Sequence, residues 1–594
     1  MSKNKGSQAS KQTRNRNLLI VASVVIFSLL LCGTITVRTG MWIWGQFGSD
    51  DTEVATTDTP QPAWDEQSAE LTVAVSPLMA PVLAQLAEQF NSQTQQTPDG
   101  QPMRVQITPY EPAKMIDDAL ESPSFQALSP DSSLWLDRLE QAWLAKVGQS
   151  EQTGVVPVGQ QRISGQVRYA VSPVVIVAWE SVARELGWPE KAIGWKTIQQ
   201  KATQDSNFKW NHPSTNNASG LLATLAEFYA GAGLTRGLTE EAATAPATLE
   251  YVRAVEATVR FYGEGEEVIM QRLAEEGRTF LDAFVAQERV VIEWNRNPTG
   301  ERLVAIYPAE GALWTDHPLA LVELATPNDA QVVTDQQRLT YQAFSQFLVS
   351  AEAQSVLLAA GYRPADLNID LGSGDSPFAN TDAVDWREPQ TTLQVPSPAV
   401  VEVVQNFWYY TKRPTNVYLV VDTSGSMEEG NKLARTKEAL RAFVEQIKGD
   451  RDQIGLLEFA SGSKNFTPIR PLDASVQSDL LGQIEQMEAI GGTALIDGVY
   501  EAADDLLSQG DSEAINALVV MTDGQENESE RSLDDLNALL ARHADQRLVI
   551  FTIAFGSDAD EALLEAIAKI GNGQFRRASE TDIEELYRII STYF

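Results

Sequence analysis

The chain has 594 residues and should contain more than one domain, because a single hydrophobic core rarely grows beyond about 250–300 residues. Its composition is that of a globular protein, neither low-complexity nor fibrous. The formal net charge is −36, from 81 acidic and 45 basic residues, and such a field repels nucleic acid and anionic membrane surfaces. It favours cations and basic partners, although a solvated acidic surface that keeps the protein soluble is the simpler interpretation.

The chain is poor in cysteine and histidine. Cys32 is the single cysteine, so neither an intramolecular disulfide nor a thiolate zinc site can form. The three histidines, His212, His317 and His543, lie far apart in the sequence and form no HxxxH pair. We therefore expect each of them to be an ordinary structural or surface residue.

The N-terminal segment has the pattern of a membrane anchor. Residues 1–17 carry five basic and no acidic side chains and form the predicted cytoplasmic tail. Residues 18–37 carry no charge, and about 20 apolar residues at 1.5 Å each span a ~30 Å hydrocarbon core. Because a positive flank stays cytoplasmic, the main body should lie outside, in the periplasm or the extracellular space.

A cleaved signal peptide and a lipoprotein are the alternatives to this anchor. A signal peptide would have a shorter apolar segment followed by an A-x-A-like site, which is missing here. Leu31 precedes Cys32 at a position where a lipoprotein signal usually has Gly, Ala or Ser. We therefore expect an uncleaved transmembrane signal anchor. A flexible stalk should follow over 38–69, which is rich in Thr, Asp, Pro and Gly.

Residues 70–370 alternate between strand-like and helix-like segments. ELTVAV at 70–75 is typical of a strand, the next segment has helical spacing of Leu and Phe, and MRVQITPY at 103–110 is again typical of a strand. The alternation predicts an α/β domain with a mainly parallel sheet, and its size predicts two lobes. Residues 371–415 are predicted to form a linker and a joining helix.

Residues 416–594 alternate again and predict an open, doubly wound, Rossmann-like α/β sheet. NVYLVVD at 416–422 and NALVVMTDG at 516–524 are apolar runs, as expected of central parallel strands buried on both faces. Both runs end in aspartate, Asp422 in the first and Asp523 in the second. Ligands bind in such sheets beyond the carboxyl ends of the strands, so these side chains should lie at a binding edge.

Five side chains with oxygen atoms are expected to converge at that edge. They are Asp422, Ser424, Ser426, Thr493 and Asp523. We expect Thr493 to start a helix that follows a Gly-Gly turn. Oxygen ligands without sulfur or imidazole suit a hard divalent cation, Mg²⁺ first, with Mn²⁺ or Ca²⁺ as alternatives. Helix caps and turns around a degenerate site are the alternative interpretation.

These motifs carry a family resemblance. DTSGS at 422–426, GGT at 491–493 and TDG at 522–524, on a predicted α/β sheet, resemble a von Willebrand factor A (vWA) domain with a complete metal-ion-dependent adhesion site. The resemblance covers about the last 180 residues, and none of the five ligand positions departs from the family pattern. It implies that an open position on the bound metal accepts a carboxylate from a protein partner.

The preceding domain is similar to bacterial extracellular solute-binding proteins of the two-lobed periplasmic type 2. Segments such as YAVSPVVIVAWESVARELGWPEKAIGWKTI and FKWNHPSTNNASGLLA carry this resemblance, which implies a ligand cleft between the lobes. Candidate ligand-binding residues at expected strand-to-helix junctions, where a hydroxyl and free helix N–H groups favour an anion, are Ser76, Ser133, Ser172 and Ser219. A helix cap without a ligand is the simpler interpretation of each.

The sequence favours a membrane-anchored extracytoplasmic binding protein over an enzyme, because no nucleophile–base pattern is visible. In this interpretation the protein partner supplies a carboxylate to the metal, and the first domain binds a small molecule. A receptor of an ABC-type import system, with an accessory vWA domain, is the alternative. A partner of an AAA-type ATPase is a third interpretation, which the predicted topology opposes because such ATPases use cytoplasmic ATP.

Overall fold

The computed structural model describes residues 68–146, 161–323 and 333–579, apart from isolated positions within them, and four positions between 583 and 590. The chain separates into Met1–Trp64 and Asp65–Phe594, and all described residues belong to the second unit. The predicted tail at 1–17, the anchor at 18–37 and nearly all of the stalk at 38–69 lie outside the described residues. Among the residues that are described, no helix is long and apolar enough to cross a membrane.

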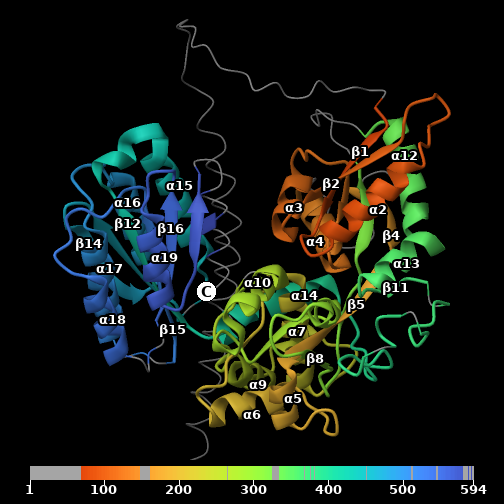
Figure 1. The fold of residues 1–594 in the computed structure, drawn as a ribbon, viewed down its shortest axis with the longest axis horizontal. Helices are drawn as coiled ribbons and strands as arrows, with labels where there is room; N and C mark the ends of the chain where they lie inside the picture. The colour runs from red at the N-terminus through yellow and green to blue at the C-terminus, as the bar shows by residue number, and fades with distance from the viewer. Residues whose placement is uncertain are drawn as a thin grey trace, which may run out of the picture. The chain divides into compact units, whose positions relative to one another are not determined.

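The first sheet has the strand order β2-β1-β3-β10-β4 (Figure 1). Its strands are β1 (Glu70–Val75), β2 (Arg104–Pro109), β3 (Ala127–Ser129), β4 (Ile163–Arg168) and β10 (Pro318–Val322). The flanking helices are α2 (Ala80–Ser92), α3 (Pro112–Leu120), α4 (Ser133–Lys146), α12 (Asp335–Leu348) and α13 (Ala351–Ala359). Because strand side chains alternate, Val73 faces α2 and α12 while Ala74 faces α3 and α4. Helices therefore cover both faces.

The second sheet has the order β11-β5-β7-β6, with β8 and β9 also paired to β5. Its strands are β5 (Ala170–Trp179), β6 (Trp210–Asn211), β7 (Ala283–Gln287), β8 (Leu303–Ile306), β9 (Trp314–Thr315) and β11 (Arg363–Pro364). Its helices are α5 (Glu180–Leu186), α6 (Trp195–Gln204), α7 (Ala218–Ala232), α8 (Glu240–Ala243), α9 (Pro246–Glu256), α10 (Glu266–Glu276), α11 (Arg289–Arg296) and α14 (Pro398–Thr411), with a 3₁₀ turn η1 (Gly277–Thr279). The joining helix α14 packs on α7, α8 and α9.

The chain passes between these two sheets at Tyr169, between β9 and β10, and between α13 and β11. Each sheet has its own helices, and the chain crosses from one sheet to the other at these three places. The region therefore has two lobes. The predicted α/β class of this region is therefore confirmed. The predicted mainly parallel sheet is wrong, because β10 runs antiparallel to both β3 and β4, and β5 runs antiparallel to β7 and β8. Both sheets are mixed.

The C-terminal sheet has the order β14-β13-β12-β15-β16-β17 and is parallel except for the edge strand β14. Its strands are β12 (Thr415–Asp422), β13 (Gln453–Phe459), β14 (Ser463–Pro471), β15 (Ile515–Thr522), β16 (Val549–Phe555) and β17 (Phe575–Ala578). Its helices are α15 (Lys432–Gln446), α16 (Ala474–Gln486), α17 (Leu495–Ser508), α18 (Leu533–Arg542) and α19 (Glu561–Ile570), with a 3₁₀ segment η2 (Gly425–Asn431).

Helices cover both faces of this sheet, as predicted for a doubly wound fold (Figure 1). Leu419 of β12 packs in the cluster that contains α15 and α16, whereas its neighbour Val420 packs in the cluster that contains α17, α18 and α19. β12 is buried along its whole length, which is why its sequence is a nearly continuous apolar run. The strand order reverses direction at β12, so β12 and β15 end side by side at the edge where such sheets bind ligands.

Candidate metal and ligand sites

The loops after β12 and β15 bring four of the five predicted oxygen-bearing residues into one hydrogen-bonded chain. The backbone N–H of Ser424 donates to Asp422 Oδ1 over 2.7 Å, which folds the loop back over the end of β12. The hydroxyl oxygens of Ser424 and Ser426 lie 3.0 Å apart. The Ser426 hydroxyl then donates to Asp523 Oδ1 over 2.7 Å and joins the two loops.

Thr493 reaches the same edge from the turn before α17. A Cβ atom added to Gly524 would lie 3.0 Å from Thr493 Oγ1 and 3.6 Å from Ser426 Oγ, so both hydroxyls lie close to Gly524, the residue after Asp523. Thr493 was expected to start the helix, but α17 begins at Leu495. The backbone N–H of Thr493 instead donates to Asn527 Oδ1, which fixes its position from the loop after β15.

The two carboxylates of this edge, Asp422 and Asp523, are completely buried. Burial raises the pKa of Asp422 to about 6, and the charge of Asp523 adds to the shift. Thr522 donates a hydrogen bond to the second oxygen of Asp422, and this bond partly offsets the rise in the Asp422 pKa. Two buried carboxylates and three hydroxyls, without sulfur or imidazole, fit a hard divalent cation, because its charge would balance both.

Lys432 also belongs to this edge, and the sequence analysis did not identify it. It is the first residue of α15, and its Nζ lies 2.6 Å from Asp523 Oδ2. The lysine side chain is only 13% exposed, so this ion pair lies largely away from water. The signal in the sequence is weak, since a lysine at the start of a helix is usually a solvated surface residue.

A second group of polar residues lies near the crossings between the two lobes. Within the described part of the chain, each of these five side chains has a buried nitrogen or oxygen atom without a hydrogen-bond partner. The group, which we call the interlobe cluster, consists of Ser76, Asp131, Gln287, Arg289 and His317. Buried polar atoms are nearly always paired, so unpaired atoms gathered in one region indicate a place for a ligand or water.

Short polar contacts join several members of the interlobe cluster. His317 Nε2 lies 2.9 Å from Gln287 Oε1, and the backbone N–H of His317 donates to the Asp131 carbonyl over 3.3 Å. Arg289 donates across the lobes to the Leu78 carbonyl over 3.2 Å. Burial and, second, the positive charge of Arg289 lower the pKa of His317 to about 3, so the ring is neutral.

Carboxyl groups surround this cluster. Burial raises the pKa of Asp131 to about 8, and the charge of Glu266 is the next cause. The pKa of Glu267 is also raised to about 8, by burial and then by Glu266. Below this pH both carboxyl groups hold a proton and can donate as well as accept hydrogen bonds, which favours a ligand with several hydrogen-bonding groups.

The four candidate serines occupy different environments. Ser76 follows β1, and its hydroxyl is one of the unpaired atoms of the interlobe cluster. Ser133 begins α4, but its backbone N–H already donates to the Asp316 carboxylate over 2.7 Å. Ser219 is the second residue of α7 and donates its hydroxyl to Glu266. Ser172 lies inside β5, so its predicted place at a strand-to-helix junction is wrong, because β5 continues through the crossing to Trp179.

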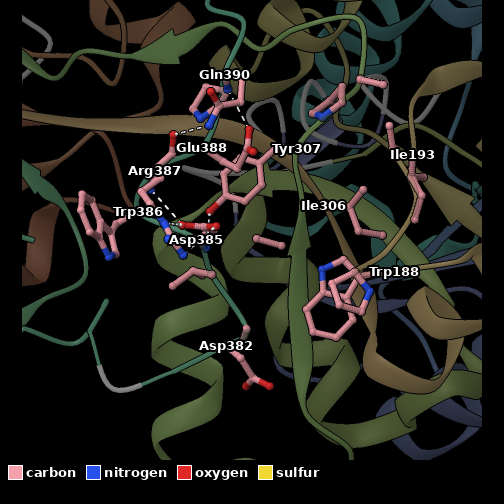
Figure 2. Close-up of a pocket in the computed structure, with 18 of the residues that line it drawn as sticks. Trp188, Ile193, Ile306, Tyr307, Asp382, Asp385, Trp386, Arg387, Glu388 and Gln390 are labelled. Carbon is pink, nitrogen blue, oxygen red and sulfur yellow. Dashed lines mark hydrogen bonds and ion pairs between the residues drawn. The ribbon is translucent and has the colours of Figure 1, made fainter. Parts of the chain in front are cut away.

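A cavity of about 740 Å³ opens elsewhere on the second lobe (Figure 2). Tyr307 lies between Trp188 and Trp386 in this view. Several charged residues also line it, among them Asp382 and Arg387. One wall comes from residues 378–391, within the predicted linker, where the Ala383 carbonyl accepts a hydrogen bond from β8. The sequence of this segment resembled an ordinary loop and did not indicate a cavity.

Comparison with known proteins agrees with both resemblances. Residues 416–589 match the von Willebrand factor type A domain family, and residues 71–363 match the bacterial extracellular solute-binding protein family. The chain therefore contains a domain of each kind.

Individual relatives cover only parts of the chain. Human inter-alpha-trypsin inhibitor heavy chain H4 is 28% identical over 176 residues, which are 29% of this chain and 19% of that protein. The uncharacterized protein YfbK of Escherichia coli K12 is 24% identical over 195 residues, 32% of each chain. The chain thus spans less than a third of the length of these curated relatives.

Solved structures match each domain separately. The sulfate-binding protein SubI from Mycobacterium tuberculosis H37Rv is 16% identical, with a TM-score of 0.35, and the match covers 50% of this chain and 88% of that one. A von Willebrand factor type A protein from Catenulispora acidiphila is 20% identical, with a TM-score of 0.27, covering 30% of this chain and 43% of that one.

The pKa of Asp131 leads to a stability prediction. The folded protein keeps the Asp131 proton up to about pH 8, whereas the unfolded chain releases it near pH 4, so the free energy of unfolding should fall as pH rises between these values. Asp131→Asn removes the titrating group and with it this fall in the free energy of unfolding. Above about pH 8 it should raise the free energy of unfolding by at least about 1 kcal/mol, since one pKa unit corresponds to about 1.4 kcal/mol.

Urea unfolding followed by tryptophan fluorescence measures this effect in the first domain, because all 13 tryptophans precede residue 409. The exposed Asp117, changed to Asn, is the matched control and should behave as the wild type. An identical pH dependence for Asp131→Asn and the wild type would contradict the prediction.

Proposed function

We propose that this protein is a membrane-anchored, extracytoplasmic binding protein rather than an enzyme. Its vWA domain recognises a protein partner through a divalent cation, which Asp422, Ser424, Ser426, Thr493 and Asp523 hold. Mg²⁺ is the proposed ion because the donor atoms are all oxygen. The observation that carries this proposal is the meeting of two buried carboxylates and three hydroxyls where β12 and β15 end.

The charge of the protein explains why a metal would matter for recognition. With a net charge of −36, the chain repels an acidic partner. A bound divalent cation would reverse the charge locally and supply a positive centre for a partner carboxylate. The two carboxylates of this edge would balance the charge of the cation. The serine and threonine hydroxyls at the same edge would supply further oxygen ligands.

The anchoring part of the proposal rests on the sequence. An uncharged segment at 18–37 follows a basic segment at 1–17, and this order favours a cytoplasmic N-terminus with the two domains outside. An extracytoplasmic location also suits a domain related to bacterial extracellular solute-binding proteins.

Partner capture tests the metal dependence. The full chain, immobilised and incubated with solubilised membranes of the source organism, should retain its partner in Mg²⁺ and lose it in EDTA. Asp422→Ala should lose the partner even in Mg²⁺, because it removes a buried carboxylate from the edge. Ser557→Ala is the matched control, since Ser557 is an exposed hydroxyl in the loop after β16 at the same sheet edge. Equal partner recovery with and without EDTA would refute the proposal.

Lys432 provides a second test that needs no partner. Its ammonium shares Asp523 with the proposed cation, so the two positive charges should compete. Lys432→Gln should tighten Mg²⁺ binding by about 5- to 150-fold, the range of a 1–3 kcal/mol coupling. Titration calorimetry on the full chain measures this affinity, with Lys437→Gln on the same helix as the control. Unchanged Mg²⁺ affinity in Lys432→Gln would show that lysine and metal do not share the site.

Import of a small molecule is the second candidate function, and the interlobe cluster favours it. Its unpaired buried atoms and the protonated carboxyl groups beside them suit a polar small molecule with several hydrogen-bonding groups. Mass spectrometry of small molecules released from the denatured full chain should find such a compound with the wild type and with Asp117→Asn. Asp131→Asn should release much less. A wild-type protein that releases nothing would count against this candidate.

A further inference from the structure

Three buried side chains meet in the second lobe, away from both sites described above. His212 directly follows β6, Glu227 lies on α7 and Glu256 is the last residue of α9. All three are completely buried. His212 Nε2 lies 3.3 Å from Glu256 Oε2 and 3.9 Å from Glu227 Oε1, and one ligand atom from each residue lies within 4.8 Å of the others.

The hydrogen bonds of His212 leave its other nitrogen facing the two carboxylates. Its Nδ1 lies 2.7 Å from the carbonyl oxygen of Pro213, which can only accept, so Nδ1 carries the proton. In the neutral ring Nε2 then carries a lone pair and no proton. Nε2 and the two carboxylate oxygens therefore face one another in the buried interior, where a metal ion or a proton between them relieves their repulsion.

Glu227 is the second, independent sign that a ligand belongs here. Within the described structure, neither of its carboxylate oxygens has a hydrogen-bond partner. A buried carboxylate without partners is among the costliest groups in a protein interior. The Thr224 hydroxyl, one helical turn earlier on α7, is also buried and unpaired.

Glu256 is held from outside the cluster by two donors. The Tyr262 hydroxyl donates to Glu256 Oε2 over 2.7 Å, and Trp408 Nε1 donates to Glu256 Oε1 over 2.6 Å. Trp408 belongs to the joining helix α14, which packs on α7 and α9 (Figure 1). Outer contacts of this kind orient metal-binding side chains and keep them charged.

We propose that His212, Glu227 and Glu256 bind a structural zinc ion. Zinc takes imidazole and carboxylate ligands at about 2.0–2.2 Å, so at tetrahedral angles neighbouring ligand atoms lie about 3.3–3.5 Å apart. His212 Nε2 lies 3.3 Å from Glu256 and 3.9 Å from Glu227, and all three ligand atoms lie within 4.8 Å of one another, so Glu227 has to move toward the other two to reach this range. Every ligand is buried, so the ion would be closed off from solvent and would tie β6, α7 and α9 together beneath α14. The second Glu227 oxygen, which also lacks a hydrogen-bond partner within the described structure, is available for the fourth position.

This zinc site differs from the proposed Mg²⁺ site in its chemistry. The C-terminal edge offers only oxygen atoms, whereas this cluster includes an imidazole, which Mg²⁺ binds poorly and Zn²⁺ binds well. Variants at one site therefore report on that site alone. Asp422→Ala should leave the zinc content unchanged, and Glu227→Gln should leave calorimetric Mg²⁺ binding unchanged.

Elemental analysis of the full chain tests the inference. After equilibration with Zn²⁺ and removal of loosely bound metal, the wild type, Asp422→Ala and Glu250→Gln should each retain one zinc ion per chain. Glu250 is an exposed residue of α9 and serves as the matched control. Glu227→Gln keeps the shape of the side chain but removes its charge, so it should lose the zinc. Wild-type protein with only traces of zinc would overturn the proposal, and so would Glu227→Gln protein with as much zinc as the wild type. Either result would indicate that the three side chains share a proton instead of a metal ion.

A spectroscopic measurement on the wild type keeps the inference testable if Glu227→Gln does not fold. Co²⁺ in place of Zn²⁺ should give the visible absorption of a four-coordinate ion with nitrogen and oxygen ligands. Sulfur ligation is excluded by the chain itself, whose single cysteine is Cys32. A Co²⁺-treated protein that keeps no cobalt after dialysis, or shows no such absorption, would overturn the proposal.

Discussion

The pairing of β12 with β15 is the constraint on which the C-terminal domain and its site depend. Parallel register places the end of β12 beside the end of β15, so two aspartates about a hundred residues apart in sequence come together at one buried edge. Burial and the charge of Asp523 disfavour the ionised form of Asp422 at this edge. The serine hydroxyls and Lys432 reduce this cost in the structure, and a divalent cation would remove most of it.

The same physical situation recurs in the solute-binding domain. Asp131 in the interlobe cluster and Glu227 in the second lobe both have buried carboxylate oxygens without partners in the described structure. The chemistry around each carboxyl group indicates what could bind beside it. The oxygen ligands at the sheet edge suit a hard cation, and the imidazole of His212 suits zinc. The hydrogen-bond donors and acceptors around His317 suit an organic molecule. Buried carboxyl groups thus recur at three sites in a chain whose overall charge is strongly negative.

Much of the fold could be predicted because the apolar runs are long and clear. NVYLVVD and NALVVMTDG indicated central strands, and both proved to be buried throughout. Ser424 and Asp523 belong to short motifs that directly follow predicted strands. They could be placed at the sheet edge because parallel strands end at the same edge. The antiparallel edge strand β14 was not predicted, since SKNFTPIRP is mostly exposed and lacks a buried face. Lys432, Glu227 and Glu256 meet their neighbours through tertiary contacts between distant segments, which no local pattern records, and the sequence predicts only an ordinary structural role for His212.

The proposed cation at the β12–β15 edge is tested most directly by crystals of the protein grown with Mn²⁺, whose anomalous scattering locates the ion without reference to any partner. The account predicts an anomalous peak within bonding distance of the Ser424 and Ser426 hydroxyl oxygens, beside Asp422 and Asp523, with Lys432 shifted away from Asp523. A map without a peak at this edge, with Lys432 still 2.6 Å from Asp523 as in the structure described above, would contradict it.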